Sequence, residues 1–176
     1  LAMMNKRFNT AKGGFETALA NLRRHGIRVY GTFIFGYDGD TPHSFAPTVA
    51  FAEEHAFYIA AFNHLTPFPG TPLYQRLQAE GRLLYDAWWL DDRYSYNRIP
   101  FTPRGMSPEA LQRACLEARR AFYGWKSIMR RSVDPVNRGN GFMWRNFYMI
   151  NAMHRQDVSL RDHYPLGDEA WQGPLL

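Results

Sequence analysis

The chain has 176 residues, of which 45% are hydrophobic and 16% aromatic, which suits one sizeable core or two small ones and excludes a disordered tail. Its apolar runs are shorter than the roughly 20 residues of a membrane-spanning helix, and no signal-peptide pattern opens it, so we expect a soluble, cytoplasmic protein. Cys115 is the single cysteine. It excludes a disulfide framework, a cysteine-rich zinc site and an iron–sulfur cluster held by this chain's own thiolates.

The net charge of +5 comes mostly from arginine. It concentrates between Arg104 and Arg145, a segment with nine basic and three acidic residues. A basic stripe of this kind attracts phosphates, nucleic acid or an acidic partner domain. A solvated helix face explains it better, because aromatic and apolar residues interleave with the arginines at helical spacing. No nucleic-acid-binding motif accompanies the stripe, so we do not expect nucleic acid as a partner.

The first part of the chain alternates helices and strands. A helix is predicted from Thr10 to His25, followed by Gly26 as its C-cap, and a strand from Ile27 to Gly36 with apolar residues on both faces. The next helix is expected to begin near Ser44, after a loop or a short kinked turn, so that Pro47 falls in its first turn. A second strand, Phe57 to Leu65, completes a right-handed βαβ unit with parallel strands.

The later part is predicted to be mainly helical. A proline-rich loop, 66–72, precedes a short helix from Leu73 to Glu80, and residues 85–101 are irregular apart from a short helix near Trp88. The strongest helix starts after Ser107, and another runs from about Gly141 to His154, before an irregular tail. The buried stripe of the strongest helix is expected to comprise Leu111, Cys115, Ala118, Phe122, Trp125 and Met129. Cys115 is thus predicted to be a buried structural residue.

Candidate functional residues follow the two strands, because parallel α/β folds bind ligands at the carboxyl ends of their strands. After the first strand, glycines allow close backbone approach, and Asp38 or Asp40 offers hydrogen-bond acceptors. After the second, Asn63, His64 and Thr66 are polar, and Phe68 offers a stacking surface. Spacing alone favours an ordinary turn after the first strand and a structural role for the histidine after the second. We predict no metal ligands and no catalytic residue within the chain.

Two segments carry a resemblance to a known family. The run GTFIFGYDGDTP at 31–42 and the run LTPFPGTPLY at 65–74 closely resemble the later half of radical S-adenosylmethionine enzymes, in particular the class with an N-terminal cobalamin-binding domain. The opening 4–9 resembles the segment after that barrel's fourth strand. Three stretches, 106–109, 122–125 and 165–169, resemble the C-terminal extension of the same group.

The resemblance implies an α/β fold: residues 1–84 would be the C-terminal βα units of a partial (β/α)₆ TIM-like barrel, and residues 85–176 a mainly α-helical extension. In that family a CxxxCxxC motif holds a [4Fe–4S] cluster, which cleaves S-adenosylmethionine to a 5′-deoxyadenosyl radical. This chain lacks the motif, so the cluster and any cobalamin would be held upstream, and the fragment alone is expected to be inactive.

By position, the resemblance implies that S-adenosylmethionine contacts the two strand ends. The implied cofactor-binding residues are Ile34, Phe35, Gly36, Asp38, His64, Leu65 and Thr66. Tyr94, Tyr96, Asn97 and Trp125 are candidates for the wall around an unknown small-molecule substrate.

Three functional hypotheses follow. The first is a C-terminal fragment of a radical S-adenosylmethionine enzyme, with methylation of an unactivated carbon as its possible reaction and the upstream half as its partner. The alternatives are a non-catalytic basic docking module and an α/β enzyme with unrelated chemistry. Two barrel strands without their neighbours leave an unpaired edge, so we expect the fragment to self-associate or to be marginally stable.

Overall fold

The structure is a computed structural model, and it describes residues 14–161. The predicted helix start at Thr10 and the resemblances at 4–9 and 165–169 lie outside the described residues. The elements, in chain order, are α1 (Gly14–Arg24), β1 (Tyr30–Phe35), the 3₁₀ turn η3 (Pro42–Ser44), α2 (Phe45–Glu54), β2 (Ile59–His64), α3 (Pro72–Ala79), the 3₁₀ turn η4 (Trp88–Leu90), α4 (Pro108–Phe122), α5 (Trp125–Ser132), α6 (Pro135–Arg138) and α7 (Gly141–Leu160).

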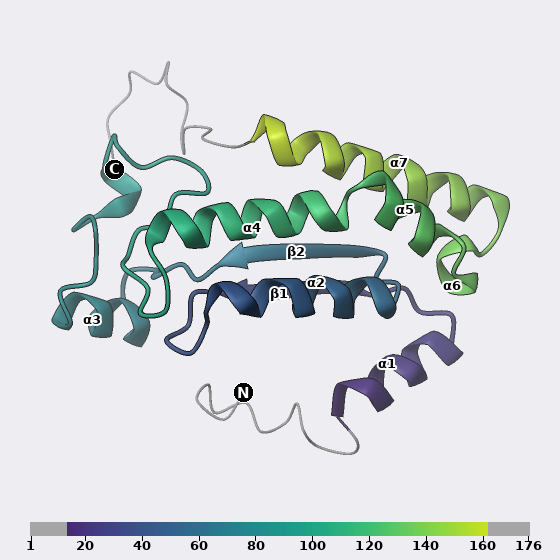
Figure 1. Cartoon of the computed structure of the whole chain (residues 1–176), viewed down its shortest axis with the longest axis horizontal. Coiled ribbons are helices and arrows are strands. Elements are labelled where there is room, and N and C mark those ends of the chain that lie inside the picture. The colour runs from purple at the N-terminus through teal and green to yellow at the C-terminus, as the bar shows by residue number, and fades with distance from the viewer. Residues whose placement is uncertain (1–13, 162–176) are drawn as a thin grey trace.

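The described residues form a mixed α/β structure around one parallel strand pair. Strands β1 and β2 pair in the register Tyr30 to Ile59 through Phe35 to His64, with α2 as the crossover between them. Figure 1 shows α2 and α4 running alongside the pair, and α7 returning past α4 and α5. The predicted βαβ unit is therefore confirmed, whereas the strands within residues 14–161 do not close a barrel.

Local sequence signals place several helix ends as predicted, whereas β1 begins three residues after the predicted Ile27 and α7 continues past the predicted end at His154 to Leu160. Gly26 and Gly81 follow α1 and α3 with φ of 67° and 64°, in the left-handed region that glycine adopts without strain. The Ser107 side chain accepts a hydrogen bond from the Ala110 N–H and caps α4. The turn η3 precedes α2, so Pro47 lies in the first turn of that helix, where its missing N–H costs nothing.

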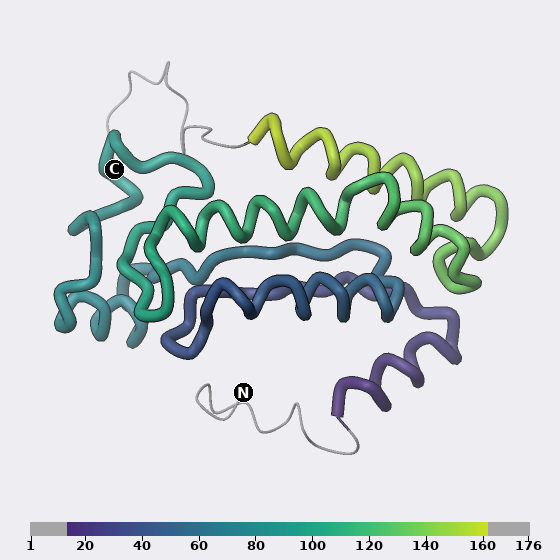
Figure 2. Tube along the Cα trace, in the orientation of Figure 1, coloured from purple at the N-terminus to yellow at the C-terminus, as the bar shows by residue number. Residues whose placement is uncertain are grey.

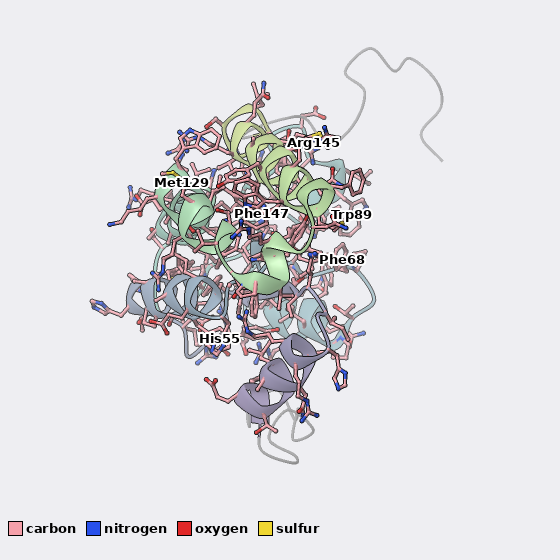
Figure 3. The ribbon with its side chains drawn as sticks, turned by 90° about the vertical axis from the view of Figure 1, so that its right-hand side faces the viewer. His55, Phe68, Trp89, Met129, Arg145 and Phe147 are labelled. Atoms are coloured by element: carbon pink, nitrogen blue, oxygen red, sulfur yellow. The ribbon has the colours of Figure 1, made fainter. Side chains whose placement is uncertain are left out.

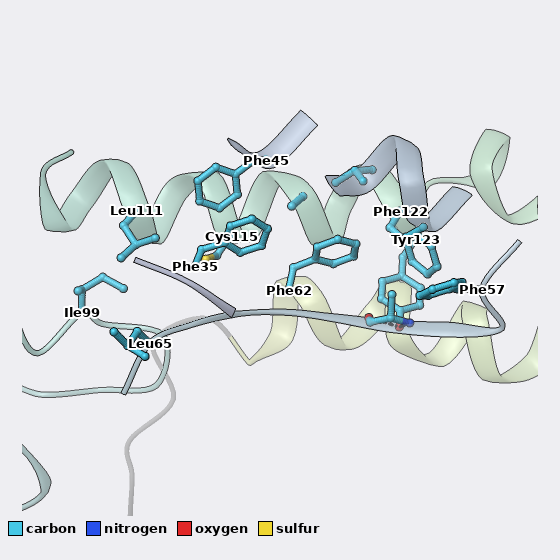
Figure 4. Packing of buried hydrophobic residues seen from close by; sticks show 14 of the residues in the cluster. Phe35, Phe45, Phe57, Phe62, Leu65, Ile99, Leu111, Cys115, Phe122 and Tyr123 are labelled. Atoms are coloured by element: carbon cyan, nitrogen blue, oxygen red, sulfur yellow. Dashed lines mark hydrogen bonds between the residues drawn. The ribbon is translucent and has the colours of Figure 1, made fainter. Parts of the chain in front are cut away.

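The main hydrophobic core lies between the strand pair and helices α2 and α4. Phe62, Leu111 and Phe122 are fully buried there, and Cys115 is only 2% exposed, as predicted (Figure 4). A smaller cluster joins Tyr58, Ile128 and Phe147 beneath α5 and α7. The tube in Figure 2 shows α5 and α6 beyond one end of α4, and α7 running back from there past α4.

The opposite face of the strand pair is exposed along β1 and half-buried along β2. Residues in register lie on the same face, so this open face comprises Tyr30, Thr32, Ile34, Ile59, Ala61 and Asn63. Tyr30 is 64% and Ile34 45% exposed. The prediction that β1 is covered on both faces is thus wrong within residues 14–161, because α2 and α4 both pack on one side.

The strongest predicted helix divides in two at Tyr123 and Gly124. Gly124 has extended backbone angles and begins α5, so the helical phase of the buried stripe is interrupted there. As a result Trp125 and Met129, predicted to be buried, are 49% and 55% exposed, while Ile128 is buried instead. Figure 3 shows Phe147 among the helices and Met129 at their margin.

The two outer edges of the strand pair differ. The Tyr123 hydroxyl donates to the Ala60 C=O at 2.8 Å and accepts from the Ala60 N–H at 3.3 Å, and Arg119 Nε donates to the Phe62 C=O at 2.9 Å. The residues leading into β2 are capped likewise: Asn137 donates to the Ala56 C=O, Arg131 to the Phe57 C=O, and Asn151 to the Tyr58 C=O. No described side chain donates to or accepts from the backbone of β1 in this way. Within residues 14–161 the sheet therefore ends at β2 and is open at β1.

Candidate functional site

The two candidate segments meet at the carboxyl end of the strand pair. Ile34 pairs in register with Asn63 and Phe35 with His64, and the Leu65 N–H donates to the Phe35 C=O at 2.7 Å. The structure thus brings together residues about 30 positions apart, as the parallel arrangement predicts. This strand-end region is the first part of the candidate site.

The candidate residues of β1 divide between the two faces of the sheet. Ile34 lies on the open face, whereas the Phe35 ring is buried and stacks on Phe45 with ring centroids 4.1 Å apart. Gly36 has φ of 104°, and a Cβ there would lie 2.8 Å from a Leu111 methyl group. Only Ile34 among these three presents a side chain toward the open face; Phe35 packs on α2 through Phe45, and Gly36 allows the close approach of α4.

The two aspartates after β1 already have partners. Asp38 carboxylate oxygens lie 3.0 Å from Arg82, 3.3 Å from Arg76 and 3.6 Å from Arg104. Asp40 Oδ2 accepts the N–H groups of Gly36 and Tyr37 at 2.9 and 3.0 Å, and so closes the turn. A ligand bound to Asp38 would have to share it with three guanidinium groups.

The candidate residues after β2 differ in their availability. Burial lowers the pKa of His64, which keeps its ring neutral at neutral pH, and its Nδ1 lies 3.1 Å from the Leu65 C=O. The Leu65 N–H is used by β1, while Thr66 makes no hydrogen bond within residues 14–161. Thr66 therefore has polar groups at this strand end that are free for a ligand.

Beside β2, a cleft of about 330 Å³ forms between the open face and helices α4 and α7. Its lining includes Asn63, Tyr96, Asn97 and Arg119, and Arg119 is a functional candidate that sequence reasoning missed. Of the four wall candidates, Tyr96 and Asn97 line this cleft, Trp125 lines a different one, and Tyr94 is buried against Trp88. In the sequence, Arg119 follows the core residue Cys115 by one helical turn. Only the packing of α4 against β2 shows that this position faces the cleft.

The residues present do not fit a metal or cluster site. Burial raises the pKa of the Cys115 thiol to about 12, so it is not a thiolate at neutral pH. Among residues 14–161, no three His, Cys, Asp or Glu side chains gather in a way that would hold a metal ion. Every helix in the same range is too short or too polar to cross a membrane.

The arginines of the basic region differ in their surroundings. Arg131 is fully buried, Arg119 lines the cleft, and Arg130 lies 3.5 Å from Glu53. Arg104 pairs with Asp38 and Glu80. Four of the nine basic residues are thus engaged in packing, ion pairs or the cleft, whereas Arg113, Arg120, Lys126, Arg138 and Arg145 are exposed.

In sequence, the chain is similar to methyltransferases and to a cyclase. It is 31% identical over 157 residues to the bacteriochlorophyllide d C-12(1)-methyltransferase of Chlorobaculum tepidum, covering 89% of this chain and 32% of that protein. It is 23% identical to the bacteriochlorophyllide d C-8(2)-methyltransferase of the same organism, over 76% of this chain and 29% of the relative.

A third relative is the anaerobic magnesium-protoporphyrin IX monomethyl ester cyclase of Cereibacter sphaeroides, 27% identical over 99% of this chain and 27% of the relative. The chain spans less than a third of the length of these relatives. No family model and no solved structure matches the chain. These similarities agree with the resemblance of the two strand-end motifs to radical S-adenosylmethionine enzymes.

Proposed function

We propose that this chain forms the last two strand–helix units and the helical C-terminal part of a radical S-adenosylmethionine enzyme. The observation that carries the proposal is the asymmetry of the strand pair. Side chains of the C-terminal helices cap β2, as expected at the last strand of a partial barrel, whereas β1 is open to a preceding strand. The similarity to nearly the whole chain but to less than a third of the relatives supports the same view.

An apolar groove at the open edge supports an upstream neighbour. It measures about 680 Å³ and lies along β1 between α1 and α2, with Phe15, Phe33 and Phe51 in its lining. Phe15 is 50% exposed. A strand and helix from the upstream part of the barrel would cover these rings, and burial of apolar surface would stabilise the joined parts.

The proposed division of labour follows from the residues. The upstream part would bind the cluster that reductively cleaves S-adenosylmethionine, because Cys115 alone, buried and protonated, does not fit that group. Within this chain, Thr66 would offer hydrogen bonds to the cofactor at the end of β2, and Ile34 an apolar surface on the open face. The partly buried, neutral His64 would position this strand end rather than exchange protons.

The reaction we propose is methylation of an unactivated carbon, with cobalamin bound by the upstream part. The names of the relatives, two methyltransferases acting at numbered carbons and a cyclase, support chemistry at carbon. The resemblance of the motifs to the cobalamin-associated class supports the second cofactor.

The test compares this chain with the same chain extended upstream in its own gene. Both are reconstituted anaerobically with iron and sulfide, and iron content, bound cobalamin and 5′-deoxyadenosine formed after reduction are measured. We expect a cluster and 5′-deoxyadenosine only with the extended protein. A stoichiometric cluster in this chain alone, or none in the extended protein, would contradict the proposal.

A further inference from the structure

Arg119 holds a positive charge in the cleft with only neutral partners. Its Nε donates to the Phe62 C=O at 2.9 Å, Nη1 to Asn97 Oδ1 at 2.7 Å, and Nη2 to Asn63 Oδ1 at 3.3 Å. No described carboxylate lies within ion-pair distance of it. Three hydrogen bonds fix the guanidinium in place, and N–H groups on Nη1 and Nη2 are left over for a further acceptor, since a guanidinium has five.

The other charged groups of the cleft do not neutralise Arg119. Asp157 is the one carboxylate among the lining residues, and it pairs with Arg161 at 3.2 Å. His154 stacks on Tyr123, and burial lowers the pKa of its ring, which is therefore neutral near pH 7. Two arginines and one aspartate leave the cleft with a net positive charge.

The rest of the lining suits an apolar body. Tyr30 and Tyr96 lie at the cleft with 64% and 39% of their surface exposed, and Ile59 and Val158 add aliphatic walls. An aromatic ring or hydrocarbon placed on these side chains would lose water contact, while an acidic group at its end reached Arg119. The cleft thus pairs apolar walls with one fixed cation.

We propose that this cleft binds the carboxylate of an otherwise apolar small molecule, with Arg119 as the recognition residue. This inference rests on the proposed function in one respect: it takes the bound molecule to be the substrate of that enzyme. The carboxylate of S-adenosylmethionine is the other source of the same chemistry, and the experiment separates the two.

The probe is 1-pyrenebutyrate, a fluorescent planar hydrocarbon with one carboxylate, and its methyl ester is the uncharged control. Binding to the full chain is followed by fluorescence anisotropy. A charge-assisted hydrogen bond to a fixed guanidinium predicts that the acid binds at least about tenfold more tightly than the ester. Equal affinities for acid and ester would overturn the proposal.

Asn63→Asp tests Arg119 without removing it. The new carboxylate would stand where Asn63 Oδ1 lies, 3.3 Å from Nη2, so it neutralises the guanidinium while keeping the contact and the fold. We expect the preference for the acid to disappear in Asn63→Asp. It should persist in Arg120→Gln, which removes the neighbouring exposed arginine of α4, a residue that lines a different cleft. Loss of the preference in Arg120→Gln, or its survival in Asn63→Asp, would contradict the assignment.

A parallel titration with S-adenosylmethionine decides the source of the carboxylate. We expect its binding to be unaffected by Asn63→Asp. If the substitution weakened S-adenosylmethionine and left 1-pyrenebutyrate unchanged, the substrate assignment would be wrong. The binding assay needs neither cluster nor turnover. If the acid shows no preference over the ester, the proposed function is unaffected. If the reconstitution experiment fails, the conclusion about carboxylate binding is unaffected.

Discussion

Arg131 shows how a charged residue serves as a packing residue in this molecule. It is fully buried, its guanidinium lies 3.7 Å from the Phe122 ring centroid, and its nitrogens donate to three backbone carbonyls and to the Ser127 and Asn151 side chains. It therefore ties α5 to the turn before β2, to the end of α4 and to α7.

We expect Arg131→Met to lower the free energy of unfolding by about 3 kcal/mol or more, because several buried carbonyls lose their donors at once. Urea denaturation measures it. Arg130→Met is the matched control, since Arg130 is 58% exposed and its pair with Glu53 lies at the surface, where such pairs contribute about 1 kcal/mol or less. Similar effects of the two substitutions would show that Arg131 has no special role.

Cys115 makes the stability of the chain fall with rising pH in the alkaline range. Burial raises the pKa of its thiol to about 12, well above that of an exposed thiol in the unfolded chain. Above about pH 8.5 unfolding therefore releases a proton, and stability falls as pH rises, by up to about 1.4 kcal/mol per pH unit. Burial raises the pKa of Tyr123 to about 12, which adds the same trend at higher pH. Urea midpoints from pH 7.5 to 10 measure the loss, and Cys115→Ala should make it smaller; an unchanged slope would contradict this account.

At the scale of elements, the C-terminal helices act as a substitute for a strand along β2. The Tyr123 hydroxyl satisfies both backbone groups of Ala60, and donors from α4 to α7 satisfy the carbonyls on either side of it. A protected edge of this kind prevents another strand from pairing with β2.

Tyr123→Phe should cost about 1–3 kcal/mol of stability, because the Ala60 N–H and C=O are buried without a partner. It should also speed hydrogen exchange of the Ala60 amide, measured by NMR. Tyr30→Phe removes an exposed hydroxyl from β1 and should change neither property. Unchanged exchange at Ala60 in Tyr123→Phe would mean that the edge is protected in another way.

At the scale of the whole molecule, β1 is the edge through which we propose that the isolated chain associates. A lysine in place of Thr32, an exposed residue at the centre of β1, should weaken self-association about tenfold or more, since charged side chains block strand pairing. Thr102→Lys makes the same charge change at an exposed position away from β1. Sedimentation at several concentrations compares the two. Equal weakening would point to net charge, and no association in the unchanged chain would remove the proposal.

The sequence by itself determined the parallel βαβ unit, the burial of Cys115 and the helix ends at Gly26, Gly81 and Ser107, because spacing and capping are local properties. It also located the two strand-end segments that meet in the structure. Only the tertiary structure decided the rest. The break at Gly124 turned Trp125 and Met129 outward, and the packing of α4 beside β2 brought Arg119 into the cleft and Tyr123 onto the strand edge. The positions of Arg119 and Tyr123 depend on contacts with β2 residues more than 50 positions away, which no local pattern encodes.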